Sequence, residues 1–143
     1  MQVKRIMIFR RIKVKHQPEM SESKKINLKK RSTCPISCTL DVIGDKWTAL
    51  IVRDMFFFGK SRFEEFLASP EKISTNILTA RLKKMEENGL IEKNQYGAHR
   101  RRMDYQLTEK GKSLAGLIKQ IAVWGKKNIS GTAGLVVPSP PEK

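Results

Sequence analysis

Polar side chains in the middle of the chain have the types and spacing needed to contact a nucleic acid. Short hydroxyl and amide groups can read base edges in a major groove, and an ammonium group can neutralise a phosphate. The residues concerned are Ser74, Thr75, Asn76, Thr79 and Lys83. The alternative is that Ser-Thr-Asn only caps a helix and that the polar side chains are only solvated.

A helix running from the N-cap Ser74 to about Asn88 would position these groups. Serine is a favoured N-cap, and Asn88-Gly89 is a typical helix end. Helical rotation sets the polar residues opposite an apolar row that would hold the helix against the domain. That row consists of Leu78, Leu82 and Met85.

A short helix over 62–68 precedes this helix, and two short strands over 90–96 and 102–108 follow it. The two helices and the turn between them predict a helix-turn-helix, and the strands predict a hairpin with a basic tip. Arginines on such a hairpin can neutralise phosphates or enter a narrow minor groove. The tip residues are His99, Arg100, Arg101 and Arg102. Arg102 can instead pair with Asp104 or another nearby carboxylate.

The remaining periodic segments complete one mainly α domain with a small β-hairpin, which is the composition of a winged helix-turn-helix. Further helices are expected over 35–43, 46–58 and 109–128. The domain is expected to span 34–128. A basic N-terminal arm (1–33) that we expect to be flexible precedes it, and a tail (129–143) that we expect to be disordered follows it.

The charge of the chain favours a polyanionic partner. Lys and Arg number 29 against 14 Asp and Glu, which gives a net charge of +15. Residues 1–31 hold eleven of these cations and only two glutamates, so the arm is more basic than the domain. Double-stranded DNA is the partner that we expect from such a balance, and a merely solvated basic surface is the alternative.

Several other classes of protein are disfavoured. No apolar run is long enough to cross a bilayer, and no secretory signal is visible, so we expect a cytoplasmic protein without a membrane partner. The chain has no Gly-rich phosphate loop, no H-E-x-x-H and no G-x-S-x-G, so we do not expect an enzyme. Two cysteines and two distant histidines give no usable metal site, and no cofactor is expected.

Cys34 and Cys38 are candidates for redox chemistry. Cys34 precedes Pro35 at an expected helix start, where the partial positive charge of the helix favours a thiolate. Cys38 lies about one helical turn further on. The alternative for either residue is a small buried side chain without reactivity.

Four segments in this order resemble the HxlR-type transcriptional regulators, a MarR-related branch of winged-helix proteins. The segments are CPISCTLDVIGDKWTALIVRDM (34–55), FFGKSRFEEF (57–66), ISTNILTARLKKMEENGLI (73–91) and RMDYQLTEKG (102–111). The resemblance covers about residues 34–127. Asp45 follows Gly44 at a place where Gly-Gly is common in the family, and the hairpin tip is richer in arginine than is usual.

The resemblance implies a homodimer that binds pseudo-palindromic operator DNA. The first and last helices would form the dimer interface through Leu40, Ile43, Leu117, Ile121 and Trp124. From the residues alone, the apolar stripe of the last helix could equally pack on its own domain. Some relatives sense oxidants or electrophiles through a cysteine at the position of Cys34. Cys38 is not expected from the family and could be a resolving thiol or an accident.

The sequence therefore predicts a sequence-specific, homodimeric DNA-binding transcriptional regulator, with a thiol at Cys34 as a possible switch. A small-molecule or redox effector is possible and unidentified. The alternatives are a non-specific architectural DNA-binding protein and a winged-helix protein–protein adaptor. An acidic or apolar recognition face would indicate the adaptor, and equal binding to unrelated DNA would indicate the architectural protein.

Overall fold

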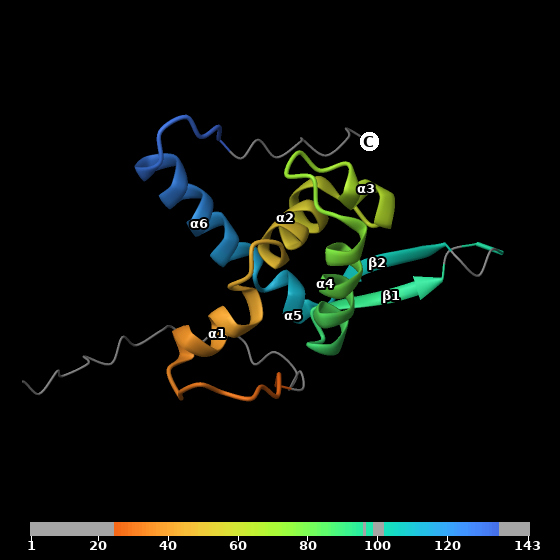
Figure 1. Ribbon diagram of the computed structural model, residues 1–143, viewed down its shortest axis with the longest axis horizontal. Coiled ribbons are helices and arrows are strands. Elements are labelled where there is room, and N and C mark those ends of the chain that lie inside the picture. Colours follow the sequence, from red (N-terminus) through yellow and green to blue (C-terminus); the bar gives the residue numbers. More distant parts are fainter. Residues whose placement is uncertain (1–24, 96, 99–101, 135–143) are drawn as a thin grey trace, which may run out of the picture.

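The computed structural model describes residues 25–95, 97–98 and 102–134. A two-stranded hairpin projects from one side of a helical body (Figure 1). In chain order the elements are α1 (Pro35–Ile43), α2 (Thr48–Phe58), α3 (Phe63–Leu67), α4 (Thr75–Glu87), β1 (Ile91–Gln95), β2 (Met103–Leu107), α5 (Glu109–Lys112) and α6 (Ala115–Asn128). The predicted mainly α fold with a small hairpin is confirmed.

One apolar core joins α2, α4, the base of the hairpin and α6. Its members come from positions spaced three or four residues apart on the helices, so each helix turns one face inward. The cluster contains Ile51, Val52, Met55, Phe66, Ile73, Leu78, Leu82, Met85, Leu90, Ile91, Tyr105 and Ile118. The apolar row predicted for α4 is therefore buried, which leaves the opposite face of that helix outward.

Both ends of α4 follow from local sequence. The Ser74 side chain accepts a hydrogen bond from Ile77 N at 3.4 Å. At the other end, Leu90 N donates to Met85 O at 2.9 Å, while Gly89 has φ +68°. A backbone in this left-handed region favours glycine, and it closes the helix and turns the chain into β1.

The hairpin is antiparallel, with a register that runs from Ile91 opposite Leu107 to Gln95 opposite Met103. The outer edge of β2 is also paired, because Tyr105 N donates to Ser61 O at 2.8 Å. This contact covers part of an edge that would otherwise be free to pair with another chain. The β1–β2 hairpin, which is the wing of the fold, is therefore attached at its base to the segment that leads into α3.

The last predicted helix, over 109–128, is wrong as a single element. The chain forms α5, bends at Ser113 and Leu114, and continues as α6. A Cβ on Gly111 would lie 2.0 Å from Leu90 O, so α5 sits directly on the backbone where α4 meets β1. Thr108 fixes this turn by donating to Gly89 O at 2.6 Å and accepting from Gly111 N at 3.1 Å. The bend then allows α6 to pack on α2.

The second helix begins at Thr48, two residues later than predicted. Asp45 accepts hydrogen bonds from Trp47 N at 2.8 Å and from Thr48 N at 2.9 Å, so residues 45–47 form a turn ahead of the helix. Asp45 thus holds the backbone just ahead of the helix, and the helix proper starts further on.

The described end of the expected arm contacts the domain. Ile26 is partly buried and packs against the core. Arg31 Nη2 lies 2.8 Å from Asp41 Oδ1 in α1. The domain contacts therefore begin before Cys34, which is earlier than the predicted boundary; residues 1–24 lie outside the described part of the chain.

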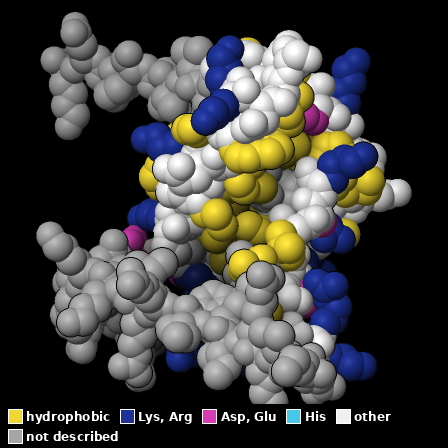
Figure 2. Space-filling view, turned by 90° about the vertical axis from the view of Figure 1, so that its left-hand side faces the viewer, with side chains coloured by type: hydrophobic (Ala, Val, Ile, Leu, Met, Phe, Trp, Pro, Cys, Tyr) yellow, Lys and Arg dark blue, Asp and Glu magenta, His cyan; other side chains and the backbone are white. Residues whose placement is uncertain are grey.

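An apolar surface remains uncovered on the side of the molecule that carries α1 and α6. Figure 2 shows hydrophobic side chains gathered there in a continuous band. Exposed side chains on these helices are Ile36, Leu40, Leu117, Ile121, Val123 and Trp124. Within the described residues, no helix is long and apolar enough to cross a membrane.

Candidate nucleic-acid interface

The outward face of α4 carries every polar residue that the sequence singled out on that helix. Ser74, Thr75, Asn76, Thr79 and Lys83 are all exposed. The first turn of α4 has no acidic side chain. Free backbone N–H groups and the positive end of the helix dipole therefore meet no negative charge there, which suits a phosphate.

The hydroxyl group of Thr79 is partly committed within the helix. Thr79 Oγ1 donates to Thr75 O at 2.8 Å. The oxygen can still accept a hydrogen bond, and the methyl group stays exposed. Thr79 can thus meet a base through an acceptor or through apolar contact with a thymine methyl group, but it is not a free donor.

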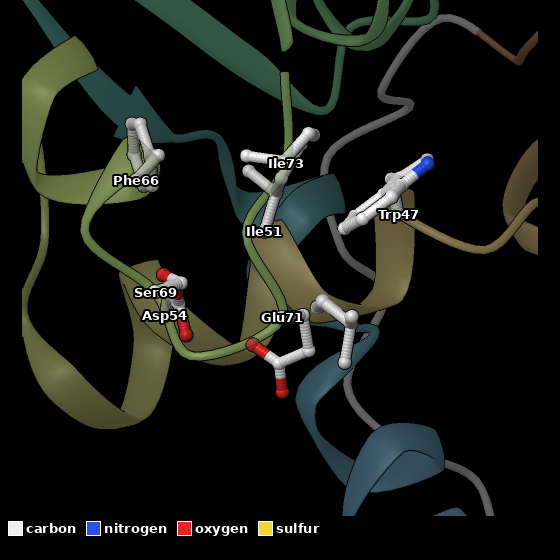
Figure 3. Close-up of a pocket in the computed structure, with 8 residues that line it drawn as sticks. Trp47, Ile51, Asp54, Phe66, Ser69, Glu71 and Ile73 are labelled. Atoms are coloured by element: carbon white, nitrogen blue, oxygen red, sulfur yellow. The ribbon is translucent and has the colours of Figure 1, made fainter. Parts of the chain in front are cut away.

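A charged cluster supports the turn between α3 and α4 from below. Asp54 is buried in α2, where Arg53 donates to it at 2.7 and 2.9 Å and Lys60 Nζ lies 3.1 Å away. Lys60 also donates to Ser69 at 2.7 Å, and Ser69 in turn hydrogen-bonds to Asp54. Figure 3 shows Asp54 and Ser69 pointing toward each other. This cluster ties α2 to the turn that precedes α4.

Arg53 extends the cluster to Glu71 in the same turn. Its two terminal nitrogens lie 2.6 and 3.0 Å from the Glu71 carboxylate oxygens, which is a bidentate pair. The hydrogen bond from Arg53 is the main cause that lowers the pKa of Glu71. A small cavity on the Ser69 and Glu71 side of this cluster has a free volume of about 10 Å³, which is room for one water molecule.

The wing is described only in part. Arg102 is exposed just before β2, and Gly97 and Ala98 are exposed at the tip. The predicted contacts His99, Arg100 and Arg101 lie outside the described residues. The hairpin base nevertheless leads away from the same body that carries α4 (Figure 1).

The two cysteines stand at the start of α1 as free thiols. Cys34 is exposed and occupies the N-cap position, where its N–H donates to Ser32 Oγ at 3.2 Å. Cys38 is partly buried, and its thiol lies 3.3 Å from Ser32 O. Among the described residues, no group of three or more His, Cys, Asp or Glu could hold a metal ion.

Most of the residues expected at a dimer interface are exposed in the single chain. Leu40 is 52% exposed, Leu117 41%, Ile121 52% and Trp124 63%. Ile43 is the exception, because it is only 6% exposed and is already covered by its own chain. Its place at the end of α1 puts it on the inner side of the helix, so it adds little surface for a partner.

Sequence reasoning missed the side chains that position α4. It gave no role to Arg53, Glu71 or Lys60, whose partners lie up to eighteen residues away. It also did not predict the pairing of Arg81 in α4 with Asp45, which lies 3.5 Å away. Charged residues this far apart in the sequence show no recognisable spacing pattern, because only the fold brings them together.

The arrangement is matched by known proteins. YybR of Bacillus subtilis strain 168, an HTH-type transcriptional regulator, is 37% identical over 109 residues, which cover 76% of this chain and 86% of YybR. The redox regulator HypR in its oxidised form is 35% identical with a TM-score of 0.60, covering 66% of this chain and 97% of HypR. Quinone-bound YodB of Bacillus subtilis is 27% identical with a TM-score of 0.54, covering 66% of this chain and 98% of YodB.

The family comparison agrees with these relatives and extends over most of the domain. Residues 42–133 match the HxlR-like helix-turn-helix family. Membership confirms the predicted family and the prediction that the chain is a transcriptional regulator and not an enzyme. This chain belongs to the HxlR-like helix-turn-helix transcriptional regulators.

Proposed function

We propose that this regulator is a homodimer that recognises a pseudo-palindromic operator, with α4 reading bases and the wing holding the backbone. The observation that carries the proposal is the division of α4 into a buried apolar row and an exposed polar row. Asn76 and Lys83 stand on the exposed row, and the first turn is free of acidic groups. An amide can pair with adenine in the major groove, and an ammonium can pair with guanine or a phosphate.

The homodimer is supported by the uncovered apolar side chains of α1 and α6. One recognition helix gives little discrimination, so related readers join two half-sites through a two-fold axis. Leu40, Leu117, Ile121 and Trp124 are candidates for that contact. A second copy of this chain would remove these side chains from water, which favours association.

Selection of duplexes from a random-sequence pool tests the central proposal. The wild-type protein should enrich a sequence with two-fold symmetry and bind it about a thousandfold tighter than a shuffled duplex. Equal affinity for the selected and shuffled duplexes would favour the non-specific architectural protein. Failure to bind either duplex at low salt would favour the protein–protein adaptor.

A thiol switch at Cys34 is a second, finer part of the proposal. Its support is the exposed thiol at the N-terminus of α1, together with relatives described as a redox regulator and as a quinone-bound regulator. A quinone can add to a thiolate, and diamide can oxidise two thiols to a disulfide.

Operator affinity before and after diamide or a quinone tests this part. The wild type should lose or gain affinity, and Cys34→Ser should not respond. Cys38→Ser is the matched variant: a response that needs both residues would assign Cys38 as the resolving thiol. An equal response in the wild type and in Cys34→Ser would remove Cys34 as the sensor.

A further inference from the structure

The corner between α1 and α2 is joined to the recognition helix by an ion pair. Asp45 Oδ2 lies 3.5 Å from Arg81 Nη1 in α4. The two side chains are 24% and 36% exposed, so solvent screens the pair less than it screens an open surface pair. The contact connects the turn between α1 and α2 with α4, the helix that carries Asn76.

The Asp45 carboxylate is fixed before Arg81 reaches it. Oδ1 accepts from Trp47 N at 2.8 Å and Thr48 N at 2.9 Å, and Oδ2 accepts from Thr48 Oγ1. Burial raises the pKa of Asp45, but these hydrogen bonds together with the charge of Arg81 outweigh it, and the pKa lies below its usual value. The carboxylate is therefore charged and held in one orientation at neutral pH.

Arg81 lies on the side of α4 between the buried row and solvent. By helical rotation it stands well away from Asn76 and Lys83. Its guanidinium turns back onto the corner at Asp45 and so is directed at the protein itself. Because Arg81 is paired with a carboxylate of its own domain, it can set the orientation of α4. It contributes little to phosphate binding.

We propose that Asp45 and Arg81 are positioning residues, which fix α4 relative to the corner between α1 and α2, so that a displacement of this corner changes the DNA-reading face. This inference rests on the proposed DNA binding by α4. The core side chains contact α4 from below. The cluster at Asp54 acts on the turn that precedes α4. The Asp45–Arg81 pair is the described ion pair that reaches α4 directly from the α1–α2 corner.

A double-mutant cycle tests the pair. Asp45→Asn keeps an acceptor oxygen for Trp47 N and Thr48 N and removes the charge, while Arg81→Gln removes the cation. Each change should weaken binding to a duplex selected by the wild type about fivefold, and the double variant should bind no more weakly than either single variant. Additive losses, or no loss, would overturn the proposal.

Binding to a shuffled duplex separates positioning from direct contact. If the pair positions α4, neither variant changes the affinity for the shuffled duplex or the salt slope. If Arg81 contacts phosphate, Arg81→Gln weakens both duplexes and lowers the slope by about 1, whereas Asp45→Asn strengthens both. That second pattern would contradict the proposal.

Amide hydrogen exchange in the protein without DNA gives a readout that does not depend on the proposed function. Exchange in the first two turns of α4 should rise in Asp45→Asn and in Arg81→Gln. Asp41→Asn is the matched control, because it removes the ion pair with Arg31 and leaves α4 untouched. Unchanged exchange at α4 would overturn the inference even if the wild type binds its operator, whereas raised exchange without specific DNA binding would sink only the proposed function.

Discussion

The outward face of α4 and the α1–α6 side of the molecule are both exposed, but they differ in composition and in what lies beneath them. The α4 face is polar, with Ser74, Asn76 and Lys83 above a buried apolar row. The α1–α6 side presents large apolar groups, and Trp124 is 63% exposed. Both surfaces belong to helices, so helix formation alone does not distinguish them.

The difference teaches that each surface suits a partner of a different kind. The start of α4 is polar and carries no acidic side chain, so replacing its bound water by phosphates and base edges costs little free energy. A continuous apolar surface gains free energy only when another apolar surface covers it. The comparison therefore separates a DNA contact from a protein contact within one small domain.

The largest expected effect comes from placing a charge on the apolar side. Ile121→Glu should yield a monomer by sedimentation and weaken operator binding by about a hundredfold or more, because an unpaired carboxylate would be buried between two subunits. Val123→Glu is the matched control, since Val123 is also exposed in α6 but helical rotation places it about 200° around the helix from Ile121. If Val123→Glu gave a monomer and Ile121→Glu stayed a dimer, the dimer contact would lie on the Val123 side of α6 and not on the Ile121 side.

The next effect concerns the polar face. Asn76→Ala should cost about 2 kcal/mol of operator binding and relax the preference at one base pair, because a bidentate base contact is lost. Lys83→Ala provides the contrast if Lys83 meets phosphate, since it should weaken all sequences alike. Unchanged preference in a selection with Asn76→Ala would remove that residue from the reading face.

A smaller, sequence-independent effect is expected at the tip of the wing. Arg100→Gln with Arg101→Gln should weaken binding about tenfold at low salt and lower the salt slope by about 2, because two phosphate contacts are lost. Lys119→Gln on α6 removes a cation from the other surface and should change neither quantity. An unaltered slope in the wing variant would mean that these arginines do not touch phosphates.

The cap of α4 should have a modest effect on stability. Ser74→Ala should lower the free energy of unfolding by about 1 kcal/mol or less, because the bond to Ile77 N is long at 3.4 Å. Urea unfolding measures the change. Thr75→Ala, which leaves the cap intact, is the reference, and an equal loss in both variants would argue against capping by Ser74.

The smallest effect expected is a pH dependence at Glu71. Arg53 lowers the pKa of Glu71 below its reference value of 4.5, so the pair stabilises the fold above that pH. This contribution is lost as the pH falls from 4.5 toward the lower pKa of the folded state. The thermal midpoint of Glu71→Gln should therefore lie below that of the wild type at pH 7. The two midpoints should approach each other at pH 3.

Much of α4 could be predicted from sequence because its signals are local. A serine cap, an apolar row and a glycine stop define the helix and its two faces without reference to other elements. The single helix predicted over 109–128 was wrong for the opposite reason. Its pattern continues through Ser113, but the helix is interrupted there. The segment before the break packs closely against Leu90 O, and Leu90 is remote in sequence.

The same distinction applies to the candidate sites. The exposure of Asn76 followed from helical rotation, whereas the burial of Ile43 depends on what covers the end of α1. The pairs between Arg53 and Glu71 and between Arg81 and Asp45 could not be predicted, since charged side chains pair across any sequence distance. Which charges remain free for DNA is therefore a property of the folded chain.

The sequence by itself determined the family, the order of helix and hairpin, and the two faces of α4, because caps, periodicity and turn residues act over a few positions. Tertiary structure decided where α5 ends and α6 begins, which apolar residues stay uncovered, and which cations are held by carboxylates of the protein. These outcomes depend on packing between segments that are distant along the chain, and no local pattern records them.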